Sequence, residues 1–136
     1  MEGFKFIEET LAEKYPHTNT DEHIWHELAN TATQFGPGWH DLIIQLVQKI
    51  EQVYKKRNVD VSEFKIDEMK EKYGGLRVSV RSSLSEVHDL ITQYEGLSES
   101  TCEECSSKSG RLHTKNEYLL TLCAECATEQ GYKKVE

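Results

Sequence analysis

Two pairs of cysteines near the C-terminal end constrain this chain more than any other feature. They are Cys102-Glu-Glu-Cys105 and Cys123-Ala-Glu-Cys126, and they contain the only cysteines of the 136 residues. Two residues between thiolates allow one tight turn to direct both sulfurs at one ion, while the insert between the pairs is long enough for a hairpin that delivers the second pair. The spacing therefore predicts a four-cysteine zinc site, with redox pairs or bound iron as alternatives.

The expected zinc site is a closed one. Four thiolates fill every coordination position of a tetrahedral Zn²⁺, so the metal cannot activate water. The composition between the pairs predicts two short strands, at 111–114 and 118–122. The second pair then begins a predicted helix at 124–130 that ends at Gly131. This order is typical of treble-clef and zinc-ribbon modules. About 35 residues are too few for an independent core, so we expect one structural Zn²⁺ to supply the missing folding free energy.

The rest of the chain predicts an α+β fold. Apolar residues recur at helical spacing over four segments, at about 2–14, 20–35, 39–57 and 84–96. Asn19 with Glu22, and Ser83 with Glu86, have the spacing of capping boxes. Alternating residues predict strands at about 63–70 and 76–81, although Met69 fits the alternation poorly. We expect a helical body with a small antiparallel β-hairpin over 1–97, followed by a zinc-binding module over 98–136.

The acidic charge of the chain is unevenly distributed. The formal net charge is -8, and residues 1–38 hold 2 basic and 7 acidic side chains. No third of the chain is basic, which argues against wide contact with duplex nucleic acid and favours a protein partner with a basic surface. Seven basic residues are nevertheless candidates for nucleic-acid or anion contacts: Lys55, Lys56, Arg57, Arg77, Arg81, Arg111 and Lys115. The first three also suit the negative end of a helix dipole.

No established catalytic motif is present, and the one candidate acid-base pair, His40-Asp41, has an alternative explanation because Asp41 also suits the positive end of the predicted helix. The chain lacks GxSxG, a P-loop and any cysteine outside the two pairs. Gly74-Gly75 precedes a strand and reads as a hairpin turn. His23 and His26 lie opposite Ile24 and Leu28 on the predicted helix, so we interpret them as solvent-facing, with a second metal site as the alternative. We expect a non-enzyme without a small-molecule substrate.

The sequence also bears on location. No apolar run approaches the roughly 18 residues that a membrane span needs, and the acidic, amphipathic N-terminus is unlike a signal peptide. These features predict a cytoplasmic protein without a membrane partner, and they leave its oligomeric state open.

Three segments occur together in a familiar order: GPGWHDLIIQLVQKIE, then MKEKYGGLRVSV, then the two cysteine pairs. Over about residues 36–131 the chain resembles a loosely defined group of small, mostly uncharacterised proteins of bacteriophages and prophages. That group shares a Gly-x-Gly-Trp helix start, an EKFGGLRF-like segment and a C-terminal CxxC pair. This chain has Tyr73 where Phe is common, and Ser106 and Ala127 where Gly often follows a cysteine pair. The resemblance implies a phage or mobile-element origin in a bacterial cell, and it brings no catalytic residue.

Three hypotheses about function follow from these patterns. The first is a non-enzymatic, zinc-stabilised accessory protein that binds and modulates or inhibits a host protein, such as a defence or transcription component. The second is a zinc-ribbon protein that binds nucleic acid. The third is an immunity protein against a basic nuclease toxin, with the acidic first third of the chain imitating the nuclease substrate.

Overall fold

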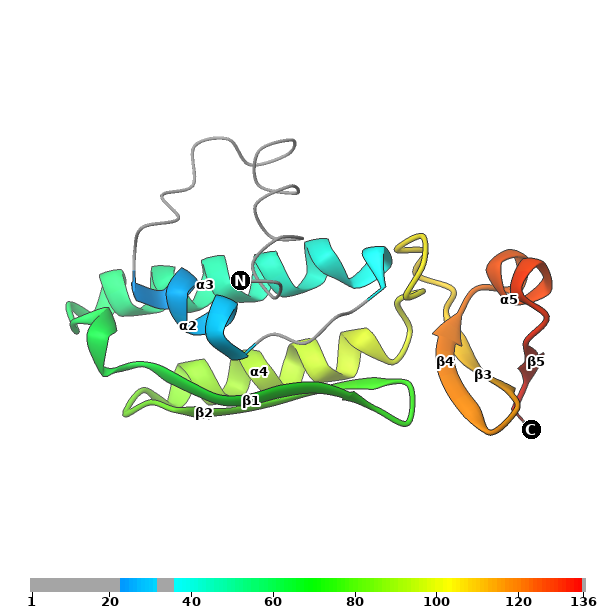
Figure 1. The fold of residues 1–136 in the computed structure, drawn as a ribbon. Coiled ribbons are helices and arrows are strands. Elements are labelled where there is room, and N and C mark those ends of the chain that lie inside the picture. Colours follow the sequence, from blue (N-terminus) through cyan, green and yellow to red (C-terminus); the bar gives the residue numbers. More distant parts are fainter. Residues whose placement is uncertain (1–22, 32–35, 136) are drawn as a thin grey trace.

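The computed structural model describes residues 23–31 and 36–135 of the chain, and these residues form an α+β fold (Figure 1). Its elements in chain order are α2 (His23–Thr31), the 3₁₀ helix η1 (Pro37–Trp39), α3 (His40–Arg57), the 3₁₀ helix η2 (Val61–Glu63), β1 (Lys65–Lys72), β2 (Gly75–Arg81), α4 (Ser85–Ser98), β3 (Arg111–Lys115), β4 (Tyr118–Leu122), α5 (Ala124–Gln130) and β5 (Lys133–Lys134). The helix predicted at 2–14 lies outside the described residues. So do positions 20–22 and 32–35 of the second predicted helix, and the expected cap at Asn19.

Helices α2, α3 and α4 pack on one side of a β-ribbon. Strands β1 and β2 form a two-stranded antiparallel sheet, which we call the ribbon; α4 packs against β2, and α2 packs against β1. Helix α3 packs on α4, on the side away from the ribbon in Figure 1. A second, three-stranded sheet has the order β4-β3-β5 and lies beyond the turn of the ribbon. None of the helices that the structure describes is long and apolar enough to cross a membrane.

Helix α3 supplies much of the hydrophobic core. The apolar residues that recur at helical spacing from Leu42 to Tyr54 are buried except for Val53, which is half-buried, and Ile44 is also buried. Trp25 and Trp39 are completely buried as well. Each large apolar side chain that folding removes from water stabilises the protein by about 1.5–3 kcal/mol. Asn58 ends α3 in the left-handed conformation, a common helix terminus for asparagine.

A β-bulge explains why Met69 breaks the alternation of β1. Ile66 pairs with Val80, whereas Glu68 pairs with Ser79, so Asp67 is an extra residue in the ladder. The bulge returns Ile66 and Met69 to the same inward face although they are three positions apart, and both are buried. A strict period of two cannot predict this arrangement.

Helix side chains occupy backbone donors at both edges of the ribbon. On β1, the Ile66 amide donates to Glu27 of α2 at 2.9 Å. On β2, the Leu76 amide donates to the Ser98 hydroxyl and the Val78 amide donates to the Glu95 carboxylate, each at 2.9 Å. At these positions the ribbon cannot pair with the backbone of another strand.

Two local predictions need correction. Tyr73 and Gly74 are the turn residues with positive φ, at 54° and 77°, whereas Gly75 already begins β2. The capping box of Ser83 and Glu86 is wrong, because the residue before α4 is Leu84 and it has no side-chain cap. Tertiary contacts compete with the box: the Ser83 amide donates to Glu63 at 2.6 Å, and Glu86 pairs with Arg57.

Tyr54 provides a test of this packing through pH. Burial raises the pKa of Tyr54 to about 12, together with the neighbouring Glu63 carboxylate, which accepts a hydrogen bond from the Tyr54 hydroxyl. The unfolded chain ionises at an ordinary tyrosine pKa of about 10, so it loses its proton first. Stability should therefore fall as the pH rises from about 10 to about 12.

We expect Tyr54→Phe to flatten that alkaline loss in chemical denaturation measured at successive pH values. Tyr73→Phe, at an exposed ring, is the control and should leave the profile unchanged. If the stability of Tyr54→Phe falls with pH as steeply as that of the unchanged protein, Tyr54 is not the cause of the alkaline loss.

Candidate metal centre

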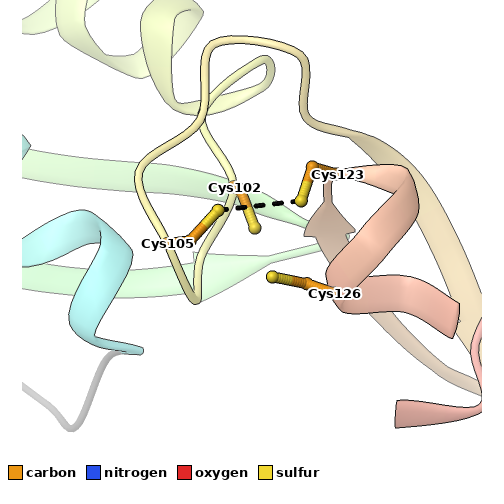
Figure 2. A group of neighbouring side chains, drawn as sticks. All are labelled: Cys102, Cys105, Cys123 and Cys126. Carbon is orange, nitrogen blue, oxygen red and sulfur yellow. Dashed lines mark hydrogen bonds between the residues drawn. The ribbon is translucent and has the colours of Figure 1, made fainter. Parts of the chain in front are cut away.

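The structure brings all four cysteine sulfurs into one cluster. The sulfurs of Cys102, Cys105, Cys123 and Cys126 lie within 4.8 Å of one another, and those of Cys105 and Cys123 are 3.6 Å apart. Figure 2 shows the side chains pointing toward a common centre, two from the loop after α4 and two from the start of α5. Cys102 and Cys123 are buried, whereas Cys105 is exposed. Four converging sulfurs of this kind can hold a metal ion.

A tight turn directs the first pair of sulfurs. The Ser106 amide donates to the Cys102 carbonyl at 3.1 Å, and the Cys102 amide donates to the Ser107 carbonyl at 2.8 Å. Ser106 has a φ of 69°, in the left-handed region that glycine adopts most easily, which is a physical reason for glycine at this position in other such turns. Ala127, by contrast, lies inside α5, where no glycine is required.

The second pair begins α5. Cys123 precedes the first helical residue, and the backbone amide of Cys126 donates to its sulfur, which lowers the pKa of the Cys123 thiol to about 7. Burial raises the pKa of the Cys126 thiol. Metal binding must therefore displace protons from this cluster, so acid weakens it.

The turn of the first cysteine pair contacts the Gly-Pro-Gly-Trp segment, which forms η1 immediately before α3. The Gly38 amide donates to the Glu103 carbonyl at 2.7 Å, and the Gly38 carbonyl accepts from the Ser106 hydroxyl at 2.8 Å. A Cβ atom on Gly38 would lie 2.0 Å from the Cys102 carbonyl oxygen. The buried Trp39 indole donates to the Thr101 carbonyl at 2.9 Å. The segment immediately before α3 thus supports the turn that contains Cys102 and Cys105, which we call the cysteine turn.

The turn of the ribbon contacts the segment that carries the cysteines (residues 98–135), which we call the cysteine module. The Thr121 hydroxyl of β4 donates to the Gly74 carbonyl, and a Cβ atom on Gly74 would lie 2.5 Å from the Leu112 side chain. The GPGW, YGG and cysteine segments therefore meet in space. Their glycines permit close backbone contact between the cysteine module and the rest of the chain.

Glu103 is a site residue that the sequence analysis did not identify. Its side chain is 4% exposed and accepts from the Thr121 amide at 2.7 Å. Burial raises its pKa to about 8. Its backbone amide also donates to the Thr121 carbonyl at 2.8 Å, so Glu103 joins the first cysteine pair to the strand that leads to the second. A glutamate between two cysteines carries no local signal for such burial.

The seven basic candidates do not form one surface. Lys55, Lys56 and Arg57 are exposed in the last turn of α3, whereas Arg111 and Lys115 lie on β3, at the opposite end of the molecule in Figure 1. Lys115 donates to the Gln130 carbonyl at 2.8 Å, and Arg111 to the Gly110 carbonyl at 2.7 Å. Arg77 and Arg81 lie together on β2.

The two histidines of α2 differ in their surroundings. His26 is exposed, as interpreted from the sequence. His23 is only half-exposed, and its Nε2 lies 2.8 Å from the Phe64 carbonyl oxygen. Within residues 23–31 and 36–135, the cysteine cluster is the one group of three or more potential ligands with metal-binding geometry, and it includes neither histidine.

Comparison of the chain with protein-family models, with curated proteins and with solved structures found no match in any of the three. The class of the site rests on its geometry, which is that of four cysteine sulfurs able to hold one metal ion, next to the contacts of this segment with Gly38 and Gly74.

Proposed function

We propose that the protein is a non-enzymatic, zinc-stabilised accessory protein of a phage or prophage that binds a protein of its bacterial host and modulates or inhibits it. The observation that carries the proposal is the pair of hydrogen bonds that Gly38 and Trp39, immediately before α3, donate to backbone carbonyls in and next to the cysteine turn. A metal held there fixes the relative position of the three segments that meet at the junction. Such a centre contributes to shape and stability, and the shape is what a partner recognises.

The donor set supports zinc as the metal. With Zn–S bonds of about 2.3 Å, the sulfurs of a tetrahedral site lie about 3.8 Å apart. Cys105 and Cys123 are already at 3.6 Å. Four thiolates give Zn²⁺ a complete coordination shell and leave no position for water or substrate, which supports a structural role and a non-enzyme.

The surface around the centre supports a partner with a basic surface. Four thiolates and one Zn²⁺ carry a net charge of about -2. Glu104 and Glu125, which lie between the cysteines of the first and the second pair, are both exposed. This acidic surface adds to the formal charge of -8, and opposite charge on a partner speeds and orients encounter. The immunity hypothesis depended on residues 1–38, most of which lie outside the described residues.

Affinity capture from a bacterial lysate tests the proposal. The zinc-loaded protein is one bait, and the Glu104→Gln/Glu125→Gln variant is the matched bait, because it removes two charges at exposed positions without touching a cysteine. We expect a host protein that the first bait enriches and the second releases at lower salt, followed by direct binding of the purified pair. If neither bait enriches a protein over the tag alone, the proposed function is wrong.

A further inference from the structure

The outward side of the ribbon carries an unusual arrangement of charge. Lys70 lies directly opposite Arg77 in the ladder, and Lys65 directly opposite Arg81. Like charges in directly opposed positions destabilise an antiparallel pair, so packing does not explain them. We define the ribbon face by the outward basic residues of the two strands and by the turn: Lys65, Lys70, Lys72, Tyr73, Arg77 and Arg81.

Acidic residues compensate this face only in part. Lys70 pairs with Glu68 at 2.6 Å, Arg81 with the bulge residue Asp67 at 3.1 Å, and Arg77 with Glu99 at 3.7 Å. These pairs are solvent-exposed, and such pairs are weak enough to be exchanged for phosphate. The five cations outnumber their three acidic partners, in a chain whose total charge is strongly negative.

The turn adds an aromatic ring to the cations. Tyr73 is 70% exposed, and the Lys72 ammonium lies 5.7 Å from the centre of its ring. Gly75 has no side chain, so the Arg77 guanidinium lies along the strand over it, and its Nη1 donates to the Leu76 carbonyl at 2.9 Å. Lys72, Tyr73 and Arg77 thereby gather at one end of the ribbon.

This end of the ribbon is held in place by its contacts. The Gly74 amide donates to the Glu71 carboxylate at 2.7 Å, and the Gly74 carbonyl accepts from the Thr121 hydroxyl. Glu27, Glu95 and Ser98 occupy backbone donors at the ribbon edges, so a ligand here is recognised by side chains. A row of cations that ends in an exposed aromatic ring matches a chain of phosphates with unpaired bases, because any base can stack on the ring.

We propose that the ribbon face binds single-stranded nucleic acid, with its cations on successive phosphates and Tyr73 stacked on a base. This binding goes beyond the proposed function and does not depend on it, because the ribbon face and the acidic surface around the cysteines are different surfaces. Single strands are favoured over duplex because paired bases are not available to the ring and because the rest of the chain repels a long polyanion.

Fluorescence anisotropy tests the proposal on zinc-loaded protein at about 50 mM salt, with labelled oligo(dT) and oligo(rU) of about 20 nucleotides. A duplex of equal length and phosphatidylserine-containing vesicles are the comparison ligands. We expect the single strands to bind most tightly. An equal or stronger preference for duplex or vesicles, or no binding of single strands with protein at about 100 μM, a level that detects even non-specific contacts, would overturn the proposal.

A pair of lysine variants locates the surface. Lys65→Gln/Lys70→Gln/Lys72→Gln should weaken binding at least about tenfold and reduce the slope of log affinity against log salt by about 2. Lys49→Gln/Lys55→Gln/Lys56→Gln makes the same change of charge on exposed positions of α3 and should alter affinity less than about twofold. Equal losses in the two variants, or a larger loss in the α3 variant, would show that the ribbon face is not the site.

Tyr73→Asn separates binding from folding. Asn-Gly is the most favoured pair for a two-residue turn in which both residues have positive φ, so this change should keep or raise the melting temperature. It removes the ring and should weaken binding about tenfold. Unchanged affinity in this variant would exclude a stacked base at Tyr73.

Discussion

We expect the replacement of Cys102 with serine to release the bound metal and to unfold the cysteine module. A serine hydroxyl is a poor zinc ligand. Because Cys102 is completely buried, a water molecule cannot easily take the place of its thiolate. Structural zinc contributes about 10–16 kcal/mol of apparent binding free energy in small zinc-dependent peptides, which is comparable to the whole stability of an ordinary domain. We therefore expect the loss of one of the four ligands to remove a large part of the folding free energy of this module.

The damage should extend to the helical body, since Cys102 and its neighbours cover the start of α3. Trp39, buried against the Thr101 carbonyl, should become exposed to water. In a Trp25→Phe background Trp39 is the only tryptophan, so a red shift of its fluorescence reports this exposure directly. Elemental analysis should give about one zinc per chain before the substitution and none after it.

Ala124→Ser is the control for this experiment, because it places the same hydroxyl at an exposed position between Cys123 and Cys126. It should retain zinc and native fluorescence. If Cys102→Ser also keeps its zinc and a buried Trp39, the cluster is not a structural metal site.

Gly38→Ala should be the most damaging change of a single methyl group among the glycines that the structure describes. The new Cβ would lie 2.0 Å from the Cys102 carbonyl oxygen and 2.6 Å from the Glu103 carbonyl carbon. Both neighbours are backbone atoms, so neither can rotate away. The cysteine turn must move off the start of α3 and lose the hydrogen bond from the Gly38 amide to Glu103. We expect a destabilisation of about 3 kcal/mol, at the upper end of the cost of overpacking.

Gly96→Ala is the matched control. Gly96 lies in the last turn of α4, and a Cβ atom there would have no neighbour within 4 Å. The same methyl group should stabilise the protein by about 0.5–1 kcal/mol, because alanine loses less conformational entropy than glycine in a helix. Urea denaturation of the two variants measures both effects. Equal stabilities of the two variants would contradict a tight junction at Gly38.

Local patterns predicted several elements to within one or two residues. Helix α3 begins one residue after its predicted start and ends where predicted, and α5 occupies 124–130 as expected. Helical periodicity, left-handed turn residues and the spacing of ligands all depend on neighbours a few positions away, so one sequence is enough to read them. The strand predicted at 63–70 was displaced by two residues because η2 precedes it, and β5 was not anticipated.

Contacts between distant segments were beyond such patterns. Ser83 has the spacing of a helix cap, yet its backbone donates to Glu63, twenty residues away. Glu103 is a charged residue between two cysteines and would be expected at the surface, yet it is buried against Thr121. For Ser83 the tertiary hydrogen bond replaces a local capping preference worth about 1 kcal/mol, and for Glu103 it offsets part of the cost of burying a carboxyl group. Nothing in the neighbouring residues signals either contact.

The sequence by itself determined that four thiols stand at ligand spacing, that the body is helical with one hairpin, and that Gly74 lies at a turn. Only the tertiary structure decided which segments these features contact. Gly38 packs against the backbone at Cys102, Gly74 accepts a hydrogen bond from β4, and the outward cations of two strands lie opposite each other. The physical reason is that spacing and periodicity are properties of the chain within a few residues. Close packing and register arise instead between segments that fold together from far apart.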